Sequence, residues 1–330
     1  MSNPRKVYPK DSVLFITTSV EEDLPFVPNY LINAILEGIL AECQERYKQQ
    51  LCGYSFMANH LHMIIRVTDP DMVSDFFRYF KTESAAALNR LLGRTKHTVW
   101  CEGFDSPLVL TSESVIEKLV YIYLNPVKAR LVNSIDEYPG LNSWAALSKG
   151  QAVKTVRRIK YSTLTKLKKL ELNFTEQMAI LKRLYRLNRA KFKIKVTPYS
   201  WMENFHDMDC FSPDNIKDEI IRRVRAEEEK IKKENIRNKK SVIGVRRLIR
   251  QVINGKYESK RSGKRTRVIS SNVTLRINGI KWHKKLSKDA QEAWLLLKFG
   301  LKAELPPGFY GPGKVVSSNI FNFMALDFRI

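Results

Sequence analysis

The feature that most constrains this chain is a pair of histidines, His60 and His62, within the apolar run 57–67. A β-strand alternates its side chains between two faces, so residues two apart point the same way. We therefore expect both imidazoles on one face of a sheet, with Met63 and Ile65 turned toward a core on the other face. An isolated His-x-His motif of this kind more often has a structural role. Two adjacent imidazoles can also supply half of the ligands of a divalent-metal site.

A helix is predicted over residues 114–125. Ser114 and Glu117 have the spacing of a capping box, which marks a helix start. Pro126 marks the end, because proline lacks an amide hydrogen and restricts the residue before it. Apolar side chains recur at helical spacing and predict the buried side, namely Ile116, Leu119, Val120, Tyr123 and Val127.

Tyr121 and Asn125 lie four residues apart on this helix, so they share one face, which is not the apolar one. A phenol and a carboxamide presented together suit a nucleophile and a contact to a metal or phosphate. Most helix tyrosines only pack, so this spacing alone does not establish Tyr121 as a nucleophile.

The positive charge of the chain is concentrated in its second half. Residues 1–150 contain 15 Lys+Arg and 17 Asp+Glu, for a net charge of −2. Residues 151–330 contain 42 Lys+Arg and 17 Asp+Glu, for a net charge of +25. This asymmetry indicates a polyanionic partner, with a merely solvated charged surface as the alternative.

Other sequence features bear on the cellular environment. Cys43, Cys52, Cys101 and Cys210 lack C-x-x-C spacing and resemble the reduced thiols of a cytosolic protein. No apolar run reaches ~18 residues, and no hydrophobic segment follows the basic N-terminus. We therefore expect a cytoplasmic protein with no membrane partner.

The pattern of elements predicts an α+β fold with a ferredoxin-like antiparallel sheet and helices in the first domain, residues 1–150. The expected strands are 13–18, 51–57 and 61–67, the expected helices 28–48, 70–92 and 114–125, with an extended piece at 98–110. The two histidines would lie on the central sheet and face the tyrosine helix.

The second domain, residues 151–330, is predicted to be a mainly α-helical, strongly basic DNA-binding region. Its expected helices are 175–193 with Thr175 as N-cap, 213–239 with Ser212 as N-cap, 242–253 with Ser241 as N-cap, and 287–299. The candidate nucleic-acid contacts are Arg246, Arg247 and Arg250 on the third helix and Lys264, Arg265 and Arg267 in the loop after it. Helix, basic loop and helix are compatible with a helix-turn-helix-like module, although basic amphipathic helices are common.

Residues 11–147 resemble the single-tyrosine HUH transposases, and most closely their REP-associated tyrosine transposase branch. The motifs occur in the family's order: 57–62 (Met-Ala-Asn-His-Leu-His), 99–104 (Val-Trp-Cys-Glu-Gly-Phe), 121–128 (Tyr-Ile-Tyr-Leu-Asn-Pro-Val-Lys), 138–139 (Tyr-Pro) and 143–144 (Ser-Trp). Ala58 stands where the family has proline, and Arg130 where glycine is common. Neither departure removes a chemical group that the reaction needs.

The resemblance implies a metal-dependent DNA endonuclease and strand transferase. Tyr121 would be the nucleophile, and His60, His62 and Asn125 would hold Mg²⁺ or Mn²⁺. The substrate would be single-stranded or hairpin DNA, including REP-like palindromes, joined to the protein as a 5′-phosphotyrosine. Tyr123 is the competing nucleophile, but its place on the apolar stripe indicates a core residue.

Two other functions stay open at the level of sequence. A domesticated, catalytically silent DNA-binding regulator of palindromic repeats would share the charge asymmetry but would not cleave. A replication initiator or relaxase of the HUH type would share the chemistry but would nick duplex DNA. The recognised sequence, the metal and the choice between monomer and homodimer are not determined.

Overall fold

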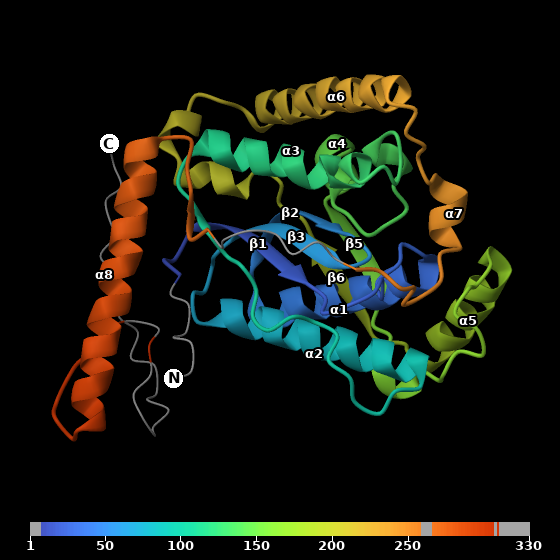
Figure 1. Ribbon diagram of the computed structural model, residues 1–330, viewed down its shortest axis with the longest axis horizontal. Helices are drawn as coiled ribbons and strands as arrows, with labels where there is room; N and C mark the ends of the chain where they lie inside the picture. Colours follow the sequence, from blue (N-terminus) through green and yellow to red (C-terminus); the bar gives the residue numbers. More distant parts are fainter. Residues whose placement is uncertain (1–7, 259–265, 307–308, 310–330) are drawn as a thin grey trace.

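A computed structural model of the chain describes residues 8–258, 266–306 and 309, and Figure 1 shows its arrangement. Its centre is a five-stranded sheet in the order β2-β3-β1-β4-β7, in which only β7 runs parallel to its neighbour. The strands are β1 (Val13–Ser19), β2 (Gln50–Phe56), β3 (His60–Arg66), β4 (Leu108–Val109) and β7 (Val268–Ile269).

The first six elements follow the ferredoxin-like order, because α1 (Tyr30–Tyr47) joins β1 to β2 and α2 (Met72–Leu92) joins β3 to β4. The strand order 2-3-1-4 with antiparallel pairing completes that topology. The predicted α+β fold with a ferredoxin-like sheet is therefore confirmed.

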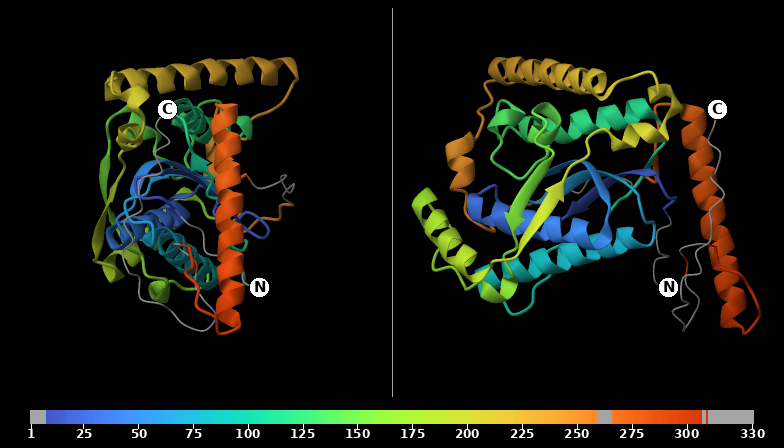
Figure 2. Two further views of the ribbon diagram at one scale, coloured as in Figure 1. Left: turned by 90° about the vertical axis from the view of Figure 1, so that its left-hand side faces the viewer. Right: turned by 180° about the vertical axis from the view of Figure 1, so that it is seen from behind.

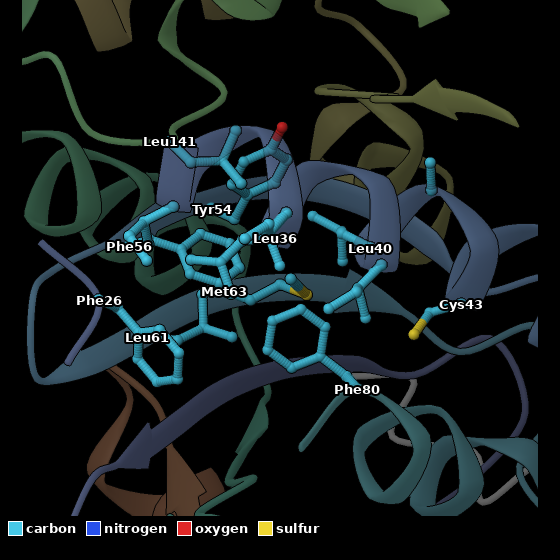
Figure 3. Packing of buried hydrophobic residues seen from close by; sticks show 14 of the residues in the cluster. Phe26, Leu36, Leu40, Cys43, Tyr54, Phe56, Leu61, Met63, Phe80 and Leu141 are labelled. Atoms are coloured by element: carbon cyan, nitrogen blue, oxygen red, sulfur yellow. The ribbon is translucent and has the colours of Figure 1, made fainter. Parts of the chain in front are cut away.

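Helices cover both faces of the sheet. The helices α1 and α2 lie on one face, and α3 (Ser112–Lys128) lies on the other (Figure 1). Met63 and Ile65 are fully buried in the core on the α1–α2 side, as the strand period predicts. Figure 3 shows Met63 among Leu36, Leu40 and Phe80, which come from the two helices.

Local signals explain where these two helices begin and end. The side chain of Asn29 caps α1 by accepting a hydrogen bond of 2.8 Å from the amide of Ile32. Helix α2 ends at Gly93, whose φ of 69° is the left-handed conformation that glycine adopts without strain. The loop after α2 is thereby turned toward the same end of the sheet as the start of β3.

The tyrosine helix α3 differs from its prediction at both ends. It starts at Ser112 after Thr111, and the predicted capping box at Ser114 is wrong, because Ser114 accepts a hydrogen bond from the Thr111 hydroxyl inside the first turn. Its end at Lys128 lies beyond Pro126. A proline in the last turn removes only one helical hydrogen bond, so the predicted end at residue 125 was three residues early.

The chain after residue 150 wraps around the first domain. Strands β5 (Val153–Arg157) and β6 (Lys191–Lys195) pair with each other and pack on α1, and α6 (Pro213–Arg237) packs along α3 (Figure 2). The other helices are α4 (Trp144–Ser148), α5 (Phe174–Leu187), α7 (Val245–Ile249) and α8 (Val273–Lys298), with 3-10 turns η1 (Ile135–Glu137), η2 (Tyr161–Thr163), η3 (Ser200–Asn204) and η4 (His206–Met208). Side chains from both halves share the two hydrophobic cores, so the division near residue 150 stays a proposal about roles.

Several predicted C-terminal helices have other bounds. Ser212 caps α6 as predicted, but the cap of α5 is Asn173, in a capping box with Glu176. The predicted cap Ser241 is wrong, because α7 starts after Gly244 and is only five residues long.

Helix α8 begins at Val273 and not near residue 287. Strand β7 lies between α7 and α8 and joins the main sheet, so these helices do not form a helix-turn-helix unit. Among the described helices, none is both long and apolar enough to cross a membrane.

Candidate active site

The structure brings the two predicted polar pairs together between β3 and α3. The rings of His60 and His62 lie side by side, with centroids 4.8 Å apart. The phenol oxygen of Tyr121 lies 3.4 Å from Nε2 of His62, and the amide nitrogen of Asn125 lies 3.1 Å from Nε2 of His60. Two histidines that are two residues apart on the strand therefore face a tyrosine and an asparagine that are four residues apart on the helix.

Neighbouring side chains fix the orientation of both imidazoles. Nδ1 of His60 lies 2.7 Å from the side-chain oxygen of Asn59, and Nδ1 of His62 lies 3.0 Å from the hydroxyl of Thr17. An amide oxygen only accepts, so we infer that His60 carries its proton on Nδ1 and has its lone pair on Nε2, which accepts a hydrogen bond from the Asn125 amide. Both Nε2 atoms thus face α3, and hydrogen bonds to the other ring nitrogen fix histidines in this way in metal sites.

Burial keeps both histidines neutral. It lowers the pKa of His60 to about 4. It lowers the pKa of His62 to about 3, with smaller contributions from His60 and from the ammonium of Lys118. A neutral imidazole is the form that binds a metal ion. At neutral pH both rings therefore have the protonation state that metal binding requires.

Two lysines flank the ring of Tyr121. Nζ of Lys118 and Nζ of Lys128 each lie 5.6 Å from the ring centroid. Burial raises the pKa of the Tyr121 phenol, which disfavours the phenolate that a nucleophile requires. A positive charge close to a phenol favours its anion, so the two lysines are candidates to assist ionisation of Tyr121 during the reaction.

Tyr123 is removed from this site. It is fully buried in the core between α3 and the sheet, and its hydroxyl lies 3.0 Å from the hydroxyl of Ser143. Burial raises the pKa of its phenol far above the usual value. The expectation that Tyr123 is a core residue is therefore correct.

The donor set at the site fits a divalent ion. Two neutral imidazole nitrogens and one carboxamide converge, a mixed set that accepts Mg²⁺ or Mn²⁺ and leaves further positions for substrate oxygens. Within residues 8–258, 266–306 and 309, no group of three or more His, Cys, Asp or Glu side chains could hold a metal.

Sequence reasoning missed four residues of the site. Lys118 and Lys128 stand three before and seven after Tyr121, a spacing that places all three on one helix face and could have revealed them. Asn59 directly precedes His60 in the motif. Thr17 has no such signal, because its partner His62 is 45 positions away and is fixed only by the pairing of β1 with β3.

The predicted DNA-contacting residues fall in different places. Arg246 and Arg247 are exposed on α7, and the exposed Arg250 follows directly as the C-cap of α7 and pairs with Glu171 at 3.3 Å. Backbone hydrogen bonds from residues 243 and 244 to residues 130 and 131 attach the start of α7 to the end of the tyrosine helix.

Arg267 is exposed beside β7, near α8, which lies at the opposite end of the molecule from α7 (Figures 1 and 2). Lys264 and Arg265 lie outside the described residues. The structure therefore does not bring Arg267 together with the three arginines of α7.

Fold and site together define a ferredoxin-like domain in which a His-x-His strand faces a tyrosine-bearing helix. Residues 25–124 match the family described as "Transposase IS200 like". The matched segment includes His60, His62 and Tyr121 and ends just before Asn125.

The chain also resembles solved structures. One is a REP-associated tyrosine transposase bound to a REP hairpin, with 19% identity, covering 44% of this chain and 83% of that chain at a TM-score of 0.38. Another is a putative transposase from Deinococcus radiodurans R1, with 16% identity, covering 37% and 95% at a TM-score of 0.27. At these scores neither likeness identifies a function for this chain. No curated protein matches it by sequence.

Proposed function

We propose that this protein is a metal-dependent DNA endonuclease and strand transferase of the transposase type. The observation that carries the proposal is the convergence of His60, His62, Tyr121 and Asn125 at one place, from two elements far apart in the sequence. The match of residues 25–124 to a transposase family supports a DNA-processing role.

In this proposal His60, His62 and Asn125 hold Mg²⁺ or Mn²⁺. The bound ion would neutralise charge that develops on the scissile phosphate and orient the phosphate. Asn59 and Thr17 keep both imidazoles turned toward that position. Because the imidazoles are neutral, each would offer the lone pair of its Nε2 atom to the ion. This part of the site holds and orients groups without exchanging protons.

Tyr121 supplies the nucleophile. Its oxygen forms a bond to the phosphorus as the bond from phosphorus to the 3′ oxygen breaks. The phenolic proton leaves to solvent, and the departing 3′ oxygen takes up a proton. Lys118 and Lys128 stabilise the phenolate before attack. The product is a 5′-phosphotyrosine with a free 3′ hydroxyl, and attack by another 3′ hydroxyl rejoins the strand.

We propose single-stranded or hairpin DNA as the substrate, with REP-like palindromes as the first sequences to test. The net charge of +25 in residues 151–330 supports a polyanionic partner for that half. The three arginines of α7 lie next to the end of the tyrosine helix, where DNA entering the site would pass. The place of action we expect is the cytoplasm.

The same charge asymmetry also supports a second function, that of a silent DNA-binding regulator. Such a protein would bind hairpin DNA in a salt-sensitive way but would not cleave it. Binding would then be unaffected by a divalent ion and by the loss of the Tyr121 hydroxyl. The two functions therefore differ in one observable, the covalent adduct.

The deciding experiment is a denaturing-gel assay with labelled hairpin DNA from the flanks of the gene, with Mg²⁺ or Mn²⁺ and with EDTA. We expect wild type and Tyr123→Phe to form a protein–DNA adduct, and Tyr121→Phe to form none. An adduct that persists in Tyr121→Phe would exclude Tyr121 as the nucleophile. No adduct on any flanking hairpin, together with salt-sensitive binding, would favour the regulator.

A further inference from the structure

A large groove lies at the C-terminal end of α2, on the α1–α2 side of the sheet, whereas the candidate active site lies on the α3 side. It has a volume of about 1410 Å³ and is bounded by α2, the loop 93–98 and the segment 161–166. Small-molecule sites typically span about 300–1,000 Å³. The size of this groove therefore suits an extended ligand better than a compact one.

The groove is strongly basic. Its walls carry Arg90, Arg94, Lys96 and Lys166 and only one carboxylate, Glu21. Within the part of the chain that the structure describes, none of these four cations forms an ion pair. Unpaired cations gathered in a concavity attract an anion with several charges.

The neutral side chains of the groove suit a nucleic-acid strand. Hydroxyl groups of Thr82, Thr95, Thr98 and Thr165 line it, and hydroxyl groups are common donors to phosphate oxygens. Tyr161 lies at the groove with 45% of its surface exposed. An exposed aromatic ring beside cations is the arrangement on which unpaired bases stack.

The groove opens at the same end of the sheet as the candidate active site. The groove loop is tied to residue 21, because the amide of Glu21 donates to the carbonyl of Val99 at 2.9 Å. The next amide, of Val20, donates to the carbonyl of Asn59 at 2.9 Å, and Asn59 orients His60. Two consecutive backbone hydrogen bonds thus connect the groove wall with the catalytic strand.

The geometry points to a binding site for the backbone of single-stranded DNA in this groove, occupied by the part of the strand that continues beyond the scissile phosphate. This inference rests on the proposed function and adds the path of the substrate. An unpaired strand presents both the phosphates and the bases that the walls can bind.

The test uses full-length protein in EDTA, so that binding is measured without cleavage. Two labelled probes are compared by fluorescence anisotropy, namely a blunt hairpin from the gene's flanks and the same hairpin with a single-stranded extension of about 12 nucleotides. The groove variant is Arg94→Glu/Lys96→Glu. Its matched control is Lys193→Glu/Lys195→Glu, an equal charge change on exposed residues of β6, near the C-terminal end of α1.

We expect wild type and the β6 variant to bind the extended probe more tightly than the blunt probe. The groove variant should lose about tenfold in affinity for the extended probe and little for the blunt one, with a salt slope lower by about 1.4. Tyr161→Ala should lose about fivefold on the extended probe while keeping the salt slope.

Equal losses for the groove and β6 variants on both probes would overturn the inference, because they would report only the general charge. No loss in the groove variant would overturn it as well. The adduct assay keeps the two proposals apart. An extension effect without an adduct contradicts the proposed chemistry alone, whereas an intact adduct without an extension effect contradicts the groove alone.

Discussion

The two halves of this chain differ in where they place charge and in what they contribute to the site. Residues 1–150 have a net charge of −2 and supply all four candidate active-site residues, buried enough to hold both histidines neutral. Residues 151–330 have a net charge of +25 and contribute mostly exposed cations around that centre. The first half thus holds the candidate reactive groups with a few local cations, whereas the second half carries the large excess of positive charge that attracts a polyanion.

The second half is nevertheless part of the same folded body. Arg158 is buried, and its Nε lies 2.6 Å from a carboxylate oxygen of Glu42 on α1, while its Nη2 pairs with Glu83 on α2. Removing one partner of a buried pair leaves an uncompensated charge. This one cation therefore ties the second half to both helices of the first.

The largest effect should follow from loss of a metal-binding residue in the first half. We expect His60→Ala to reduce the rate of adduct formation by about 10³-fold or more, because charge on the phosphate is no longer neutralised. DNA affinity in EDTA should stay within twofold of wild type, about the error of such a measurement. Calorimetric titration with Mn²⁺ measures the lost site directly, and unchanged Mn²⁺ binding would place the metal elsewhere.

A smaller effect should come from the lysines beside the nucleophile. Lys118→Met removes a cation 5.6 Å from the Tyr121 ring, so the phenolate becomes harder to form. We expect about tenfold slower adduct formation at neutral pH, and a pH–rate profile moved to higher pH. Lys149→Met, an exposed lysine on another surface, serves as control. A rate loss without any shift of the profile would contradict a role in phenol ionisation.

The comparison between the halves is sharpened by the arginines of α7. Arg246→Ala/Arg247→Ala should weaken hairpin binding about tenfold and lower the salt slope by about 1.4 to 1.8. The adduct rate at saturating DNA should not change, because neither residue touches the site. A reduced rate at saturation would show that the second half takes part in the chemistry.

The smallest effect concerns stability and pH. The folded-state pKa values of His60 and His62, about 4 and about 3, lie below the usual 6.5. Below pH 6.5 the unfolded chain takes up protons on these histidines that the folded chain does not. Their contribution to the free energy of unfolding is therefore fully present above pH 6.5 and is lost as the pH falls toward 4 to 3.

We expect Tm of wild type to fall by several degrees, about 5 °C, between pH 7 and pH 5. The decrease should be smaller in His60→Gln/His62→Gln. Thermal melts followed by circular dichroism compare the two proteins, and equal decreases would mean that other groups control this range.

The sequence alone determined the elements whose pattern is local. The alternation around His60 and His62 predicted a strand with Met63 toward the core, and the spacing of Tyr121 and Asn125 placed both on one helix face. Side-chain periodicity follows from backbone sterics within a few residues, so it can be read without knowing the fold. The order of the elements was also sufficient to predict the ferredoxin-like sheet. The count of charged residues was sufficient to identify the basic second half.

Only the tertiary structure decided which distant segments meet. The start of α8 was predicted too late, since a glycine inside a helix lowers its propensity. In the fold a Cβ at Gly279 would come 3.0 Å from the side chain of Val268, so the glycine allows α8 to approach β7 closely. Tertiary packing also brings together three other pairs of distant segments: Thr17 with His62, α7 with the end of α3, and α2 with segment 161–166. Such contacts depend on how whole faces pack against one another, which local spacing does not encode.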